Sequence, residues 1–320
     1  MNILIADKFP QHYLDELEAR GHACVSRPEL GADDLPGAVP GHAVLIVRST
    51  RVTAETIGAG DCLKLVIRAG AGTNTIDKAT ASDQGVHVCN VPGKNAIAVA
   101  ELTMGLLLAI DRNIPDNVIA LRQGQWNKKR YSEARGLCGR SMGIVGMGAI
   151  GMAVAERARA FGLETFGIDK PNRSQAVTAK LGALGVRSVA DMDALAATCD
   201  ILSFHVPASG DTQGLIGREL LARMQPHSIV INTSRGDIVD EAALVEAMES
   251  KGIRAGLDVY ANEPASGQSE FVSMLAQHPN VYGTHHIGAS TEQAQNAVAE
   301  GVVEIVDAYT QGQVLHCVNL

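Results

Sequence analysis

The chain has 320 residues, which corresponds to two domains at roughly 150 residues each. It carries 27 Lys and Arg against 35 Asp and Glu, and the formal net charge of −8 argues against general attraction to nucleic acid or an anionic membrane surface. A hydrophobic share of 46% with 19% charged residues excludes a disordered or fibrous chain.

The cysteines are scattered and contain no C-x-x-C pair, so they indicate neither a disulfide framework nor a metal cluster. The apolar run at the N-terminus is too short for a signal peptide, and residues 102–110 fall well below the roughly 20 residues that span a bilayer. We therefore expect reduced thiols, no metal and a cytoplasmic location. The six cysteines are Cys24, Cys62, Cys89, Cys138, Cys199 and Cys317.

The first 90 residues alternate between short β-rich runs and helical patterns. An amphipathic helix is expected over residues 11–20, and Gly21 ends it. Uninterrupted apolar strands separated by helices predict a parallel sheet that is covered on both faces. The expected strands are residues 2–6, 43–47, 64–68 and 86–90.

A long helix is expected from about residue 95 to 121, and a second strand and helix series begins at Ser141. A last helix over about residues 290–311 leads into a β-like tail at 314–318 that can return to the first unit. The fold class is therefore α/β, with two doubly wound parallel-sheet domains. The six strands of the second series are residues 141–146, 164–168, 201–204, 228–232, 254–257 and 281–284.

A glycine fingerprint follows the strand at residues 141–145. Gly146 makes a tight turn, Gly148 lets the backbone approach a pyrophosphate, and Gly151 allows close packing of helix and strand. Asp169 ends the next strand, where a carboxylate binds the adenosine ribose and repels a 2′-phosphate, so NAD is favoured. Lys170 and Arg173 lie just beyond Asp169 and are cations that could partly accommodate the 2′-phosphate of NADP. The expected cofactor loop is Gly146, Met147, Gly148, Ala149, Ile150 and Gly151.

Together with this fingerprint, further segments in order resemble the D-2-hydroxyacid dehydrogenase family over nearly the whole chain, and within it the phosphoglycerate dehydrogenases. The resemblance implies a Rossmann NAD-binding domain at residues 95–289, inserted into a smaller flavodoxin-like substrate domain at 1–94 and 290–320. The segments are Val-Arg-Ser-Thr at 47–50, Arg-Ala-Gly-Ala-Gly at 68–72, Asn-Thr-Ser-Arg-Gly-Asp-Ile-Val-Asp at 232–240, Gly-Leu-Asp-Val-Tyr-Ala-Asn-Glu-Pro at 256–264 and His-Ile-Gly-Ala-Ser-Thr at 286–291.

The resemblance implies Arg235, Glu263 and His286 as the catalytic set. An arginine fork suits a substrate carboxylate and carbonyl, and a histidine exchanges the hydroxyl proton near neutral pH. Glu263 would hydrogen-bond the imidazole and fix its tautomer. The family usually has Pro before the catalytic His, whereas this chain has His285. The Ile-Gly pair at residues 287–288 aligns the family motif so that His286 corresponds to the catalytic His.

The resemblance also places residues around the rest of the cofactor. Asp258 is expected to meet the nicotinamide carboxamide, with Thr233, Val206 and Pro207 lining the cofactor cleft. The remaining residues expected there are Ser234, Arg235, His286 and Gly288.

The substrate is expected to bind at a second set of residues. Backbone N–H groups of the glycine-rich turn suit the substrate carboxylate beside Arg235. Arg48, Arg68 and Lys128 fall where the phosphoglycerate enzymes place cations for a distal phosphate, although the basic run around Lys128 is also typical of a solvated face. The turn residues are Arg68, Ala69, Gly70, Ala71 and Gly72.

The expected function is NAD-dependent interconversion of 3-phosphoglycerate and 3-phosphohydroxypyruvate in serine biosynthesis by a homodimer. A sulfolactate dehydrogenase would need much the same cations, and a hydroxypyruvate or glyoxylate reductase would leave Arg48 and Arg68 without an anion to bind. An NAD-sensing binding protein on the same scaffold is the alternative from another class. The chain is expected to be a short form without a C-terminal regulatory domain.

Overall fold

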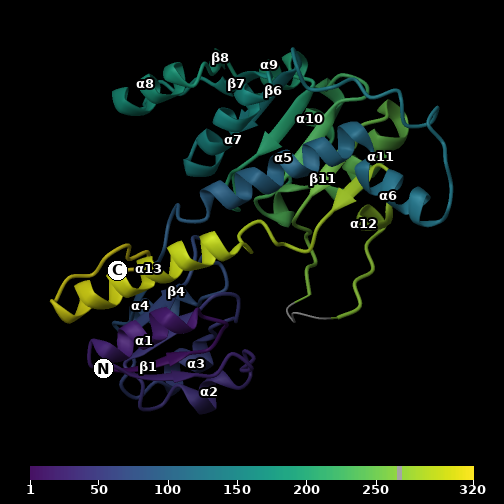
Figure 1. Cartoon of the computed structure of the whole chain (residues 1–320). Coiled ribbons are helices and arrows are strands. Elements are labelled where there is room, and N and C mark those ends of the chain that lie inside the picture. The colour runs from purple at the N-terminus through teal and green to yellow at the C-terminus, as the bar shows by residue number, and fades with distance from the viewer. Residues whose placement is uncertain (265–268) are drawn as a thin grey trace. The chain divides into compact units, whose positions relative to one another are not determined.

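The computed structural model describes residues 1–264 and 269–320. The chain divides into two compact units, each built around one parallel sheet (Figure 1). Unit 1 comprises Met1–Asn95 and Ala289–Leu320, and unit 2 comprises Ala96–Gly288. Within the described ranges no helix has the length and apolar character needed to cross a membrane.

The sheet of unit 1 has the strand order β2-β1-β3-β4-β5, which is the flavodoxin-like order. Its strands are β1 (Asn2–Ile5), β2 (Ala23–Ser26), β3 (Val44–Val47), β4 (Leu65–Arg68) and β5 (His87–Asn90). Its helices are α1 (Gln11–Ala19), α2 (Leu35–Ala38), α3 (Ala54–Ala59), α4 (Lys78–Asp83) and α13 (Glu292–Thr310).

Successive residues of these strands enter two separate cores. Ile3 and Ile5 of β1 pack with α1 and α13, whereas Leu4 of the same strand packs on the other face, in the cluster that contains residues of α2, α3 and α4. This is why the strands read as uninterrupted apolar runs. Strand β2 was not predicted, because it is an edge strand whose largely exposed residues give no such run.

The sheet of unit 2 has the order β12-β11-β10-β9-β6-β7-β8, a Rossmann arrangement with one additional strand. The six expected strands are present, and the missed β8 is a short, exposed edge strand. The strands are β6 (Ser141–Val145), β7 (Glu164–Ile168), β8 (Arg187–Val189), β9 (Ile201–Phe204), β10 (Ile229–Asn232), β11 (Arg254–Leu257) and β12 (Val281–Gly283). The predicted α/β class with parallel doubly wound sheets is confirmed.

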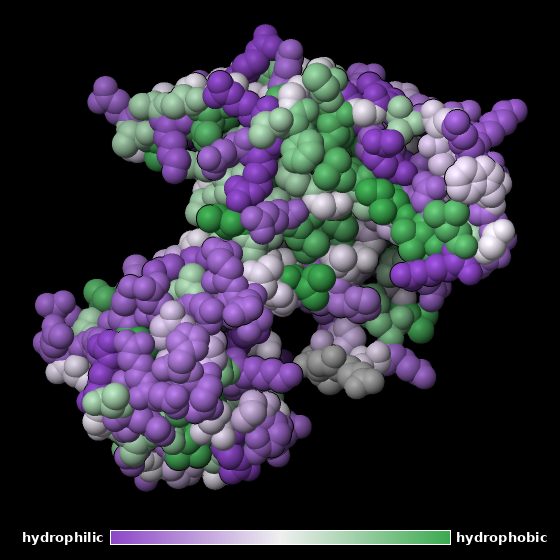
Figure 2. Space-filling view, in the orientation of Figure 1, coloured by the Kyte–Doolittle hydropathy of each residue, from purple (hydrophilic) through white to green (hydrophobic). Residues whose placement is uncertain are grey.

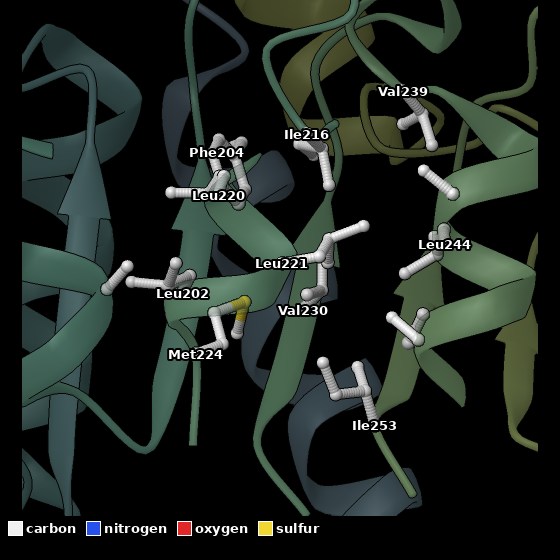
Figure 3. Close-up of a cluster of buried hydrophobic side chains, with 14 of the residues drawn as sticks. Leu202, Phe204, Ile216, Leu220, Leu221, Met224, Val230, Val239, Leu244 and Ile253 are labelled. Atoms are coloured by element: carbon white, nitrogen blue, oxygen red, sulfur yellow. The ribbon is translucent and has the colours of Figure 1, made fainter. Parts of the chain in front are cut away.

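Helices cover both faces of this sheet. On one face α10 and α11 pack Leu221, Met224 and Leu244 against strand residues such as Leu202 and Val230 (Figure 3). On the other face α5 lies across β10 and β11 and against α7. The helices are α5 (Ala96–Arg112), α6 (Ile114–Arg122), α7 (Ala149–Ala160), α8 (Gln175–Ala183), α9 (Met192–Thr198), α10 (Arg218–Arg223), α11 (Glu241–Lys251) and α12 (Met274–Gln277).

The expected single helix over residues 95–121 is wrong in one respect, because the structure has two helices there. The break falls at Asn113, whose φ of 48° lies in the left-handed region. In one continuous helix Pro115 would have no N–H to donate to the carbonyl of Asp111, and its ring would clash with that carbonyl. Pro115 is tolerated where it stands, in the first turn of α6.

Candidate active site

The glycine fingerprint forms a tight turn between β6 and α7. Gly146 has a φ of 96°, and a Cβ there would overlap the backbone of His205. A Cβ on Gly151 would overlap the carbonyl of Gly146. At Gly148, by contrast, a Cβ would meet no atom of the described residues within 4 Å. The turn is therefore closed on its protein side and open at Gly148, where a phosphate group has room to approach the backbone.

A pocket of about 160 Å³ lies at the end of β7, beside this turn. Asp169 lines it on an exposed position, and its N–H donates to the carbonyl of Val189 at 2.8 Å. Arg173 also lines it, and its guanidinium donates to the carbonyl of Ile168 at 3.1 Å. The lining residues are Met147, Gly167, Asp169, Arg173, Thr178, Leu181, Gly182, Val186 and Ser188. A carboxylate and an arginine thus share one small pocket, with the carboxylate directly at the strand end.

Arg235 is positioned by a turn that follows β10. The buried Asn232 accepts hydrogen bonds from the N–H and the hydroxyl of Ser234, at 3.0 and 2.7 Å, and donates to the carbonyl of Arg235 at 2.8 Å. Gly236 follows, and a Cβ there would overlap the backbone of Tyr260, so glycine lets this turn pack against the segment after β11. Burial lowers the pKa of Arg235, and the charges of Glu263 and Asp237 counteract that shift.

Glu263 and His286 form a hydrogen-bonded pair. His286 Nδ1 and Glu263 Oε2 are 2.6 Å apart, and the second carboxylate oxygen accepts the N–H of Tyr260 at 2.8 Å. Burial raises the pKa of Glu263, but the hydrogen bonds from His286 and Tyr260 and the charges of His286 and Arg235 outweigh it and hold that pKa below its usual value. Glu263 is therefore an ionised group that fixes the orientation of the imidazole ring.

Asp258 holds the backbone that carries His286. Its buried carboxylate accepts the hydroxyl of Thr284 at 2.7 Å and the N–H groups of Ile287 and Gly288, both at 2.8 Å. The N–H of His286 donates to the carbonyl of Asp258 at 2.8 Å. His286 has a φ of 52°, a conformation that is unfavourable for a residue with a side chain. These four bonds compensate that strain, and the expected contact of Asp258 with a carboxamide stays a prediction.

The remaining residues expected around the cofactor lie at the carboxyl ends of neighbouring strands of unit 2. Val206 packs against the Gly146 turn. The carbonyl of Pro207 accepts the hydroxyl of Thr212 at 2.7 Å. The buried hydroxyl of Thr233 is 3.0 Å from that of Thr103 on α5. Thr233 is therefore fixed to the core by its hydroxyl.

Arg48 belongs to unit 1, where it begins the turn after β3. Asp7, which follows β1, accepts the N–H groups of Arg48, Ser49 and Thr50 at 2.6, 3.0 and 3.1 Å. The guanidinium of Arg48 donates to the hydroxyl of Ser290 at 3.2 Å. Asp7 therefore fixes the backbone of this turn, while the cationic side chain has a neutral partner in Ser290.

Arg68 ends β4, the strand beside β3, and is paired in register with Val47. Its guanidinium lies over Gly70, where any Cβ would overlap it, and donates to the carbonyl of Ala69 at 3.5 Å. Gly70 has a φ of 144°, and its carbonyl accepts the N–H of Val91 at 2.9 Å. The structure therefore brings Arg48 and Arg68 to the carboxyl ends of adjacent strands, Arg48 directly after β3 and Arg68 as the last residue of β4.

Lys128 and His285 are exposed residues of unit 2. Lys128 is exposed on the segment between α6 and β6 in unit 2, whereas Arg48 and Arg68 are in unit 1. His285 is exposed directly before His286. Among the described residues, no group of three or more His, Cys, Asp or Glu side chains is placed to hold a metal ion.

Residues 104–288 match the protein family described as D-isomer specific 2-hydroxyacid dehydrogenase, NAD binding domain. The chain belongs to this family. It is 38% identical to D-3-phosphoglycerate dehydrogenase of Methanocaldococcus jannaschii over 98% of its own length and 58% of that protein. It is also 40% identical to hydroxypyruvate reductase of Thermotoga maritima, over 88% of its length and 89% of the relative. A glyoxylate reductase structure from Paecilomyes thermophila has a TM-score of 0.85 and 27% identity, covering 99% of this chain and 98% of that one.

These D-isomer specific 2-hydroxyacid dehydrogenase relatives differ in length as well as in name. The chain spans about three fifths of the phosphoglycerate dehydrogenase from M. jannaschii but nearly all of the hydroxypyruvate reductase. The family resemblance expected from the motifs is confirmed. NAD is the cofactor of the matched domain, and the open space at Gly148 together with Asp169 fits it. The Gly146–Gly151 turn and Asp169 would hold NAD, whose nicotinamide ring would supply hydride-transfer chemistry.

Three positioning residues were not found from the sequence. Asp7 and Asn232 hold the turns of Arg48 and Arg235, and the side-chain amide of Asn90 donates to the carbonyl of Ala71 at 2.6 Å. Each of them ends a buried strand or follows it within two residues. A polar residue directly after an apolar run is therefore the signal that could have identified them.

Proposed function

We propose that this chain catalyses the NAD-dependent interconversion of a D-2-hydroxy acid and its 2-oxo acid. The observation that carries the proposal is the 2.6 Å pair of His286 and Glu263, held in the same unit as Arg235 and the glycine turn. A carboxylate-oriented imidazole beside a cation is the arrangement that proton exchange on a hydroxy acid requires.

The proposed mechanism gives each side chain one task. Because Nδ1 of His286 is bonded to Glu263, Nε2 is the ring atom that takes the hydroxyl proton during oxidation and returns it during reduction. The Arg235 guanidinium binds the substrate carboxylate and polarises the carbonyl, a task for which its fixed fork is suited. Glu263, being ionised, stabilises the imidazolium that forms in the first of these steps.

We further propose 3-phosphoglycerate and 3-phosphohydroxypyruvate as the substrate pair, which would place the reaction in serine biosynthesis in the cytoplasm. In support, Arg48 follows β3 and Arg68 ends the adjacent strand β4, so unit 1 has two cations at the carboxyl ends of neighbouring strands that suit a distal anion. Lys128 is a third cation assigned to this anion on the resemblance alone. The 38% identity to a phosphoglycerate dehydrogenase favours the same pair.

Hydroxypyruvate reduction is the second candidate, because a hydroxypyruvate reductase matches the chain over 89% of its own length. Sulfopyruvate carries a three-oxygen anion that the same two arginines would bind. Glyoxylate carries no distal anion and would use Arg235 alone.

The test is a panel assay in which NADH oxidation is followed with phosphohydroxypyruvate, sulfopyruvate, hydroxypyruvate and glyoxylate. The proposal expects the highest kcat/KM with phosphohydroxypyruvate. A higher value with another member of the panel would reassign the substrate. Binding of NADH without turnover of any 2-oxo acid would point to an NAD-sensing binding protein instead.

We also propose that the chain is a homodimer that associates through α6. In support, α6 exposes a set of apolar side chains, and the visible face of unit 2 carries apolar surface over α5 and α6 (Figure 2). These residues are Ile114, Val118, Ile119 and Leu121, with Trp126 close behind them in the chain and 81% exposed. Light scattering should give twice the chain mass of 33.6 kDa, and Leu121→Glu should shift it toward the monomer. A monomeric wild-type protein would refute the proposal.

A further inference from the structure

Two of the six cysteines face each other across a β-bridge in unit 1. Cys89 on β5 and Cys317 in the C-terminal tail are antiparallel partners. The flanking hydrogen bonds run from Asn90 N–H to the His316 carbonyl at 3.3 Å and from Val318 N–H to the Val88 carbonyl at 2.9 Å. This pattern makes the cysteines a non-hydrogen-bonded pair, in which opposed Cα atoms are about 4.5 Å apart with both side chains on one face.

That backbone geometry suits a disulfide, which needs a Cα separation of roughly 4.4–6.8 Å and a Cβ separation of roughly 3.5–4.5 Å. The two thiols are free, and both pack into the core cluster that contains α1 and α13. The thiol of Cys317 donates to Oδ1 of Asn319 at 3.4 Å. The pairing of the two backbone segments is compatible with a disulfide between them.

The two thiols differ in access. Cys89 is fully buried, and burial, with a smaller effect of Cys317, raises its pKa to about 12. Cys317 is half-buried, and its Sγ is 3.8 Å from Nδ1 of His87. Cys317 is therefore the thiol that an external oxidant meets first, and Cys89 is the partner in place to resolve the product.

We propose that Cys89 and Cys317 are a redox modification site that closes to a disulfide when the protein meets a peroxide. The Cys317 sulfur attacks one oxygen of hydrogen peroxide, the O–O bond breaks, and a sulfenic acid and one water form. The Cys89 sulfur then attacks the sulfenic sulfur and displaces hydroxide, which leaves as water with the Cys89 proton. Two thiols and one peroxide thus give one disulfide and two waters, and a small dithiol reverses the reaction.

The disulfide would covalently fasten a tail that hydrogen bonds now hold on β5. The Asn319 side chain accepts the N–H of Val88 at 2.7 Å and donates to the carbonyl of Val86 at 2.9 Å. A bond between Cys89 and Cys317 would close a loop of roughly 230 residues, which restricts the unfolded chain strongly. We therefore expect oxidation to raise the melting temperature.

The test uses the full chain, oxidised with hydrogen peroxide and then alkylated without reduction. Mass spectrometry should find a cross-linked peptide pair carrying Cys89 and Cys317. Thiol titration should fall from six to four, and the melting temperature should rise by roughly 5–10 degrees, all reversed by dithiothreitol. None of these readouts depends on dehydrogenase activity, so they are independent of the proposed function.

Cys24→Ser is the matched control, because Cys24 is half-buried on β2, at the opposite edge of the same sheet. This variant should keep the cross-link and the stabilisation. Cys317→Ser, in the tail, should lose both while melting like the reduced wild type. Oxidation of Cys317 to its sulfinic acid with Cys89 still reduced, or pairing of Cys317 with another cysteine, would overturn the proposal.

Discussion

The two units place polar residues at the carboxyl ends of parallel strands in the same way, yet they hold them differently. In unit 2 Glu263 hydrogen-bonds His286, and its negative charge acts on Arg235. In unit 1 Arg48 follows β3 and bonds a neutral hydroxyl, whereas Arg68 ends β4 and its guanidinium lies over Gly70. Under the proposed function, unit 2 would carry the chemistry shared by many 2-oxo acids, and unit 1 would bind the distal anion that distinguishes one substrate from another.

The largest expected effect separates the two adjacent histidines of unit 2. His286→Asn should lower kcat by roughly 10²- to 10⁴-fold, the usual worth of a general acid/base. His285→Asn is the matched control and should remain close to the wild type, because the hydrogen bond to Glu263 comes from His286. Steady-state kinetics of NADH oxidation decides this. If His285→Asn lost activity while His286→Asn remained active, the general acid/base would be His285 and the alignment of the motif on His286 would be wrong.

A smaller effect is expected at the pocket at the end of β7. Asp169→Ala should weaken NAD binding by roughly ten- to a hundredfold, because a charged group that binds a ribose hydroxyl contributes about 1.5–3 kcal/mol. Asp169→Asn keeps the shape and removes the charge, so it should improve NADP binding relative to NAD. Dissociation constants for both cofactors provide the measurement. A wild-type preference for NADP would contradict this assignment and point to Lys170 and Arg173.

The smallest effect concerns the pH dependence of stability. The pKa of Glu263 is lowered in the folded chain, so its ionised form stabilises the native state above the ordinary Glu pKa of about 4.3. That contribution is lost as the pH falls through the lowered folded-state value. The melting temperatures of wild type and Glu263→Gln should differ at pH 6 and converge in acid. If the difference in melting temperature grew on acidification, the pKa of Glu263 would be raised rather than lowered in the folded chain.

Local sequence patterns predicted the elements that are buried on both faces. The central strands have apolar residues that enter two cores, so they can be predicted from the local sequence without tertiary information. The edge strands β2 and β8 were missed because their exposed residues form no such run. The helix break at Asn113 was missed although Pro115 was a local signal for it.

The candidate site was also predictable only in part from the sequence. The hydrogen bond between His286 and Glu263, expected from the motifs, is present in the structure. The roles of Asp7, Asn90 and Asn232 were not predictable, because each bonds a turn whose position depends on strand register. The bridge between Cys89 and Cys317 joins residues that are far apart in the sequence, so spacing alone gave no indication of it.

The division of labour between the units is tested most directly by comparing kcat/KM for phosphohydroxypyruvate and hydroxypyruvate in three variants. Arg48→Ala and Arg68→Ala should each lower the value for phosphohydroxypyruvate by roughly ten- to a hundredfold and change that for hydroxypyruvate much less. Arg235→Ala should lower both alike, because both substrates carry the 2-oxo acid end. Equal losses with both substrates in the Arg48 and Arg68 variants would contradict the account, because these arginines would then serve the fold or the shared carboxylate.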